Sequence, residues 1–199
     1  MRKIPKQRPL LDLIEAREIL PLPALSDVVK ITQAWTITQR RMAKASSDYA
    51  SALALVCEDI CRRVPALSYV DMHKVGIILK QSRSRYIATM GNTYWAERLL
   101  PKCGNEWRYV MSVHVPCFYT RSDNQKLHTL IHELWHISPA FDGQYRIFPG
   151  RYRDHGNSLA EYRKVCDEML DCYLKQRPPS EVLKWLAPVR LTPNYYYEH

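Results

Sequence analysis

The segment His132-Glu133-Leu134-Trp135-His136 carries the residue types of a hydrolytic metal site. Two histidines four residues apart lie one turn apart on a helix, so both imidazoles can bind a single metal ion. Glu133 is placed to orient a water molecule and to accept its proton. Zinc suits this chemistry, because three protein ligands leave one coordination position open and the ion lowers the pKa of bound water to about 7. The motif therefore predicts a Zn²⁺ site with Glu133 as general base.

A third ligand is needed to complete such a site, and the residues after the motif offer more than one. We favour His155, in the run Asp154-His155-Gly156, because imidazole binds zinc more commonly than a single carboxylate and the glycine allows a close approach. Asp142 is the alternative, at the offset from His136 that metzincins use for their third ligand. Pro139 stands where those proteins have a glycine, which favours His155.

Other polar side chains near the motif are candidates for the third ligand or for secondary roles. Glu161 and Glu168 would give a gluzincin-like arrangement. His128 lies ~12 Å along the helix axis from His136, too far to bind the same ion. Asp142 or Asp154 could hold a ligand histidine in its tautomer. Residues of the intervening loop are expected to anchor it by hydrogen bonds, with oxyanion stabilisation as the alternative role. These residues are Asp142, Tyr145, Arg146, Arg151, Tyr152 and Arg153.

Two amphipathic helices are predicted, one before the motif and one after it. The first begins at Ser46 or Ser47, ends at Val64-Pro65, and buries Cys57 and Cys61 as core thiols. Its apolar stripe is Tyr49, Leu53, Val56, Cys57, Ile60 and Cys61. The second spans about 157 to 176. Its apolar stripe is Leu159, Tyr162, Cys166, Met169, Leu170 and Tyr173.

The motif itself is predicted to lie on a third helix. This helix begins at Ser122, where Ser122-Asp-Asn-Gln125 fits a capping box, and it ends at Ser138-Pro139. Its core-facing stripe is Leu127, Leu130, Ile131 and Leu134. His132 and His136 therefore project from the other side of the helix.

Three strands are predicted between the first helix and the motif helix, over 75–79, 85–90 and 107–115, with turns at 91–92 and 103–105. In the third strand the alternating residues share one face. They are Trp107, Tyr109, Met111, Val113 and Val115. The pattern predicts an α+β fold, a single domain with N-terminal helices, a small sheet packed on the motif helix, and a C-terminal helix. We assign this domain to 26–199, after a basic N-terminal arm over 1–25.

Charge and cysteine content limit the class of protein. Lys and Arg outnumber Asp and Glu by 29 to 20 among the 199 residues, for a net charge of +9. This balance makes nucleic acid a candidate partner. The six cysteines form no Cys-x-x-Cys pair, which is typical of a reduced, intracellular protein without a zinc ribbon. No run approaches the ~18 apolar residues of a membrane span, and 10–25 lacks a signal-peptide core, so we expect a cytoplasmic protein that does not contact membranes.

The spacing of the candidate ligands resembles that of a known family. The run His132-Glu-Leu-Trp-His136, a spacer, then His155-Gly156 and a helix with Tyr162 resemble the SprT-like metallopeptidases. The stretch from Ile131 to Gly156 is also similar to metallopeptidases encoded by phages and bacteria, and the resemblance covers roughly 57–177. It implies a zincin core with His132, His136 and His155 as the zinc ligands and Glu133 as the general base.

Two functions of different classes follow from these observations. The first is a zinc-dependent hydrolase, a metallopeptidase that cleaves peptide bonds in a protein or peptide substrate. The alternative is a catalytically silent zincin-fold subunit that binds nucleic acid or a larger assembly, favoured by the clustered Arg and Lys and by the aromatic run Tyr195-Tyr-Tyr197.

Overall fold

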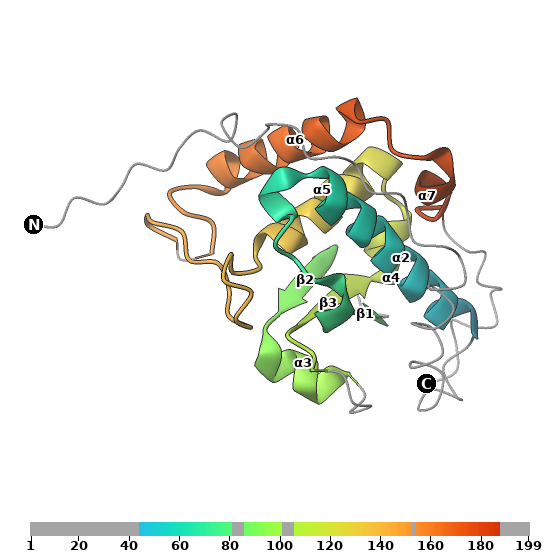
Figure 1. Cartoon of the computed structure of the whole chain (residues 1–199), viewed down its shortest axis with the longest axis horizontal. Coiled ribbons are helices and arrows are strands. Elements are labelled where there is room, and N and C mark those ends of the chain that lie inside the picture. Colours follow the sequence, from blue (N-terminus) through green and yellow to red (C-terminus); the bar gives the residue numbers. More distant parts are fainter. Residues whose placement is uncertain (1–43, 81–85, 101–105, 153, 188–199) are drawn as a thin grey trace, which may run out of the picture.

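The computed structural model describes residues 44–80, 86–100, 106–152 and 154–187 (Figure 1). These residues form an α+β fold, as predicted. In chain order the elements are α2 (Lys44–Arg63), η2 (Pro65–Leu67), η3 (Met72–Lys74), β1 (Val75–Lys80), β2 (Ala88–Gly91), α3 (Thr93–Leu99), β3 (Tyr109–His114), α4 (Val115–Tyr119), α5 (Asp123–Trp135), α6 (Leu159–Lys175) and α7 (Ser180–Lys184).

The three strands form one small mixed sheet in the order β1-β3-β2. β1 runs parallel to β3, with Val75 opposite Tyr109, and β2 runs antiparallel to it, with Met90 opposite Met111. Every residue of β3 is buried, because helices cover both faces of the central strand. Tyr109, Met111 and Val113 lie together in the main core, as the predicted alternation requires, and Val110 packs in a separate small apolar cluster. β2 lies at an edge of the sheet, next to the motif helix α5.

The predicted third strand is too long at its C-terminal end. β3 ends at His114, and Val115 is the first residue of the short helix α4. Pro116 accounts for the switch, since proline cannot donate a hydrogen bond to a strand neighbour but fits the first turn of a helix. Likewise, β2 begins at Ala88 instead of Arg85, a residue outside the described ranges.

A helix replaces the predicted turn after β2. Gly91 is the last residue of β2, and Asn92 is the N-cap residue of α3. Ala96 on α3 and the following Leu100 are buried in a small apolar cluster with Trp107 and Val110. This packing stabilises a seven-residue helix that is too short to be stable alone.

The main core is formed by α2, α5, α6 and one face of the sheet (Figure 1). All six residues of the predicted α2 stripe are buried, and Cys57 and Cys61 are free thiols inside the core, as predicted. On α6 four of the six stripe residues are buried, while Leu170 is half-buried against the core and Leu159 in the first turn is 41% exposed. α5 contacts α6 along its length and β2 at the edge of the sheet, so the motif helix lies between them.

Several predictions concern residues outside the described ranges. These are the arm at 1–25, the turn at 103–105 and the aromatic run at 195–197. Within the described residues, no helix combines the length and the apolar character that crossing a membrane requires.

Candidate metal centre

The motif helix α5 is fixed at its start by the predicted capping box. The Gln125 N–H donates to the Ser122 hydroxyl and the Gln125 side chain accepts from the Ser122 N–H. The predicted core-facing stripe is confirmed, with all four residues at most 1% exposed. The helix ends at Trp135, three residues before the predicted end, and His136 is its C-cap residue. His136 donates its N–H to the Glu133 carbonyl, so its side chain stays one turn after His132.

After α5 the chain folds back onto the sheet. Ile137 pairs with Tyr145 in an isolated bridge, and Gly143 between them has a φ of +81°. The Gly143 N–H donates to the Tyr109 hydroxyl on β3 at 3.0 Å. A Cβ at position 143 would collide with the Thr93 hydroxyl, so this close approach requires glycine. The first part of the loop is thus held against the sheet.

A second tight turn brings His155 back to the motif helix. Tyr152 and Gly156 exchange two backbone hydrogen bonds, of 2.7 and 2.8 Å, around this turn. Gly156 has a φ of +70°, a backbone conformation that residues other than glycine rarely adopt. Two residues later, Ser158 caps α6 by accepting the Glu161 N–H. The His-Gly pair therefore closes the loop immediately before α6 begins.

The structure brings the three predicted histidines together. The candidate ligand atoms of His132, His136 and His155 all lie within 4.8 Å of one another. Their ring centroids are 5.0 to 5.5 Å apart, and all three side chains are half-buried. The Nε2 atom of His155 is buried without a hydrogen-bond partner in the described part of the chain. A buried nitrogen without a partner is costly, whereas a cation shared by three imidazoles would satisfy it, so these residues fit a metal ion.

The alternative third ligands do not join this group. Among the described residues, the three histidines are the one set of His, Cys, Asp or Glu side chains close enough to share an ion. Asp142 is exposed, and its carboxylate accepts the Gln144 N–H at 3.1 Å, which fixes the turn. Glu161 and Glu168 are exposed on α6.

His128 lies one turn before His132 on α5, and as expected it stays outside the cluster. Its Nε2 is 3.2 Å from the Asp167 carboxylate on α6. Its ring centroid is 6.4 Å from that of His132. The His128–Asp167 pair thus connects α5 to α6 next to the cluster.

Burial keeps the clustered histidines neutral. It lowers the pKa of His132 to about 3, and the other histidines add to this effect. It lowers the pKa of His136 to about 4. The pKa of His155 is also lowered by burial, and the charge of the exposed Asp154 opposes this shift. Neutral imidazole is the form that binds metal, so the site is ready for a cation at neutral pH.

Glu133 is buried beside this group, with an exposed fraction of 7%. Burial raises the pKa of its carboxyl to about 8, while a hydrogen bond with the Met90 backbone on β2 works in the other direction. A buried carboxyl group whose pKa lies near neutrality can both accept and return a proton.

The ring of Tyr162 packs against all three histidines, a contact that the sequence did not indicate. Its ring centroid lies 4.7 Å from those of His132 and His155 and 5.2 Å from that of His136. Its hydroxyl donates to the His132 carbonyl at 3.0 Å, which ties α6 to α5. The sequence placed Tyr162 in the apolar stripe of α6 and in the helix after His155-Gly156, but it indicated no contact with the histidines. Periodicity identifies a buried face but not the residue on it that meets a site.

Arg146 anchors the loop, as predicted for the polar residues between the ligands. Its guanidinium donates to the Trp135 carbonyl at 3.0 Å and to the Tyr69 hydroxyl at 2.7 Å. The guanidinium also stacks on the Trp135 ring, with its Cζ 3.5 Å from the ring centroid. The backbone N–H of Arg146 donates to the His136 carbonyl. Tyr145 likewise bonds the β2 backbone at Met90. Arg153, the last of the predicted anchors, lies outside the described residues.

The arrangement as a whole can bind a divalent cation and place a proton acceptor beside it. Three neutral imidazoles converge, Tyr162 supports them from α6, and Arg146 fixes the loop that leads to His155. Comparison of the chain with family models, with curated proteins and with solved structures gives no match.

Proposed function

We propose that this protein is a zinc-dependent metallopeptidase with a zincin-like fold, in line with its resemblance to SprT-like enzymes. The observation that carries the proposal is the convergence of His132, His136 and His155, with a buried Nε2 atom on His155 that has no hydrogen-bond partner among the described residues. Three histidines are a common ligand set of catalytic zinc, and they leave one coordination position open.

The chain supplies the other parts of a hydrolytic mechanism. When bound, zinc supplies a Lewis acid that polarises a carbonyl and lowers the pKa of water. Glu133 would accept the proton of the attacking water and pass it to the leaving amine, a role that requires its carboxylate form, which a bound cation beside it would favour. Tyr162 packs against the histidines, and Arg146 fixes the loop that follows His136.

The edge strand favours a polypeptide as the substrate. β2 is at the edge of the sheet, and its Met90 backbone bonds Glu133. A sheet edge can bond an extended chain through backbone groups that are not already bonded, as those of Met90 are to Glu133 and to the Tyr145 hydroxyl. A peptide that lies along β2 would therefore pass beside the general base.

The experiment is a comparison of zinc content and proteolysis in two variants. Purified wild-type protein should contain about one zinc per chain and should cleave denatured casein. Glu133→Gln should keep the zinc and lose more than ~100-fold of the activity, the lower end of general-base contributions. Glu161→Gln, which changes an exposed glutamate on α6, is the matched control and should retain activity. Equal activity in Glu133→Gln, or no cleavage by zinc-loaded wild type, would contradict the proposal.

A further inference from the structure

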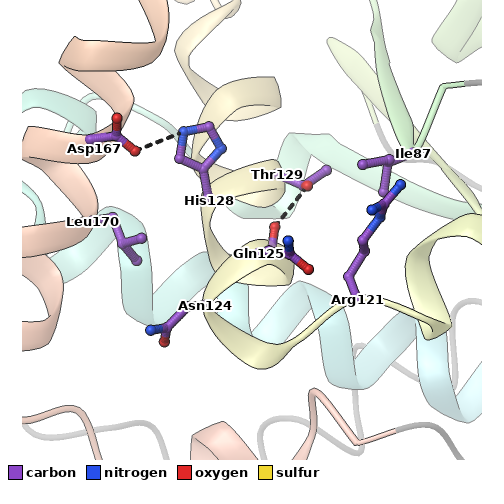
Figure 2. A pocket seen from close by; sticks show the side chains of 8 residues that line it. All are labelled: Ile87, Arg121, Asn124, Gln125, His128, Thr129, Asp167 and Leu170. Carbon is purple, nitrogen blue, oxygen red and sulfur yellow. Dashed lines mark hydrogen bonds and ion pairs between the residues drawn. The ribbon is translucent and has the colours of Figure 1, made fainter.

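The two halves of the motif helix α5 border different surroundings. The first half lines a cavity of about 370 Å³ that opens between α6 and the segment before β2 (Figure 2). There His128 contacts Asp167 of α6 at 3.2 Å. The second half carries His132 and His136, and several other segments of the chain bond its end.

A run of bonded carbonyls marks the end of α5. A helix normally has four carbonyls at its end without a partner inside the helix. Here every carbonyl from His132 to Ile137 accepts a hydrogen bond. Two of these bonds come from backbone N–H groups of the helix end itself, and the Tyr162 hydroxyl supplies a third from α6. The other three come from Arg146 and Tyr69.

Arg146 and Tyr69 bond the carbonyls of three successive residues centred on His136. Arg146 Nε donates to the Trp135 carbonyl at 3.0 Å, and the Arg146 backbone N–H donates to the His136 carbonyl at 2.7 Å. Arg146 Nη2 donates to the Tyr69 hydroxyl at 2.7 Å, and that hydroxyl donates to the Ile137 carbonyl at 2.9 Å. The backbone of His136 is therefore fixed on both sides and at its own carbonyl. We call the side chains of Arg146 and Tyr69 the Arg146 clamp.

The guanidinium of the Arg146 clamp lies among three aromatic rings. Its Cζ is 3.5 Å from the ring centroid of Trp135, 5.6 Å from that of Tyr69 and 5.8 Å from that of Phe148. The Phe148 ring also contacts Tyr162, which packs against all three histidines. A planar guanidinium can stack on a ring and donate in two fixed directions at once, which the ammonium of a lysine cannot do. These contacts therefore require arginine.

We propose that Arg146 is a positioning residue of the metal centre, which together with Tyr69 sets the direction of the His136 imidazole. The clamp thereby sets the affinity and the geometry with which the histidines bind zinc. This inference rests on the metal site of the proposed function. A residue that orients a metal ligand typically contributes about 10- to 100-fold to metal affinity. A residue that only anchored the loop would add to stability and leave the folded metal site unchanged, so the two roles predict different results at the metal.

The main test is Arg146→Lys, which keeps the charge and loses the donor with two fixed directions. Competition with a zinc-binding dye should show a zinc affinity reduced about 10- to 100-fold. Cobalt(II) in place of zinc gives a second readout, because its visible absorption depends on the arrangement of its ligands. The absorption bands of the cobalt-loaded variant should differ from those of wild type in position and intensity. Neither readout depends on hydrolysis.

Tyr69→Phe is a milder change at the other side chain of the clamp. It keeps the ring beside Arg146 and removes the hydroxyl that joins Arg146 to the Ile137 carbonyl. Zinc affinity should fall about fivefold, the effect of one hydrogen bond. This variant carries the test alone if Arg146→Lys does not fold.

The exposed pair of Arg98 and Tyr94 on α3 provides matched controls. Arg98 donates to the Tyr94 hydroxyl at 3.1 Å, and its Cζ lies 5.3 Å from the centroid of that ring, outside the histidine cluster. Arg98→Lys and Tyr94→Phe should therefore leave the zinc affinity and the cobalt spectrum as in wild type. Urea denaturation of the four metal-free variants measures their stability separately.

A double-mutant cycle tests whether the effect passes through His136. In a His136→Ala background, Tyr69→Phe should cause no further loss of zinc affinity, because the ligand that the clamp orients is absent. In a His155→Ala background, Tyr69→Phe should still cause a loss of about fivefold, since His136 remains. An equal loss in both backgrounds would overturn the positioning role.

The positioning role is also overturned if Tyr69→Phe and a folded Arg146→Lys bind zinc and cobalt as wild type does, whatever their stability. If wild type also cleaves casein, that result leaves the peptidase intact. Failure of the proposed function gives a different pattern. Zinc-loaded wild type that never cleaves casein, with both clamp variants weakened in zinc binding, would refute the peptidase and retain the positioning role. Wild type that binds neither metal would refute both.

Discussion

Two buried polar clusters in this protein differ in whether their members satisfy one another. In the first, which joins α2 to α6, the fully buried Asp59 accepts two hydrogen bonds of 2.9 Å from Arg63 Nε and a third, also of 2.9 Å, from the Tyr173 hydroxyl. Gln176 in turn donates to the Arg63 carbonyl. Charge and hydrogen bonds are thus balanced inside the cluster, and nothing further is needed from outside.

The histidine cluster has the opposite character. Its three imidazoles face one another, and each is neutral because burial lowers its pKa. Lone pairs that converge do not stabilise each other, and one buried nitrogen has no hydrogen-bond partner in the described residues. The Asp59 cluster therefore has a structural role, whereas the histidine cluster is arranged for a ligand that would satisfy its nitrogens.

The largest effect is expected in the Asp59 cluster, whose members satisfy one another. Asp59→Ala leaves the guanidinium of Arg63 buried without its partner, which should lower the free energy of unfolding by about 3–5 kcal/mol. Urea denaturation of the metal-free protein measures this change. Zinc affinity of the folded molecules should stay as in wild type, because the histidines are untouched. A loss below about 1 kcal/mol would show that the cluster is not a structural one.

The corresponding change in the histidine cluster is His155→Ala. It should weaken zinc binding by more than ~100-fold, beyond the 10- to 100-fold typical of residues that only support a ligand. Competition with a zinc-binding dye measures the affinity. The metal-free variant should unfold at nearly the urea concentration of wild type, and added zinc should raise the melting temperature of wild type alone. Unchanged affinity would remove His155 from the ligand set, and Asp142→Ala provides the comparison.

Smaller effects are expected from pH in the metal-free protein. Folded His132 and His136 have pKa values of about 3 and 4, against an ordinary 6.5, so below pH 6.5 the unfolded chain binds more protons. Their contribution to stability is therefore lost as the pH falls from 6.5 towards 3. Glu133, with its pKa raised from 4.5 to about 8, acts oppositely, and its contribution is lost as the pH rises between those values.

Glu133→Gln isolates the histidine effect. Urea denaturation of this variant in EDTA should give an unfolding free energy that falls on acidification below pH 6.5. The double variant Glu133→Gln, His132→Asn should show a shallower fall, because one titrating imidazole is gone. Identical pH profiles for the two proteins would contradict the burial of neutral imidazole at position 132.

The features that could be predicted from the sequence are local ones. The capping box at Ser122 and Gln125 and the stripes of α2 and α5 depend on neighbours within one or two helical turns. His155 could be favoured over Asp142 from ligand chemistry and from the following glycine, whose φ is +70° in the structure. The capping box and the stripes follow from spacing, because each residue acts within its own element, whereas His155 was favoured on ligand chemistry.

The features that were missed depend on contacts between distant segments. The short helix α3 is stabilised by packing against Trp107 and Val110, which its own seven residues do not reveal. The place of Tyr162 beneath the histidines follows from how α6 crosses α5. The stacking of Arg146 on Trp135 needs the loop to fold back first. In each case tertiary packing decides the structure, and no periodic pattern encodes it.

The most direct test of the central claim is a crystal structure of the zinc-loaded protein with anomalous data at the zinc edge. We predict one strong anomalous peak, with nitrogens of His132, His136 and His155 at ~2.0–2.1 Å from it. A fourth position should face Glu133. A peak bound by Asp142 in place of His155, a peak elsewhere on the surface, or no peak in zinc-saturated crystals would contradict the account.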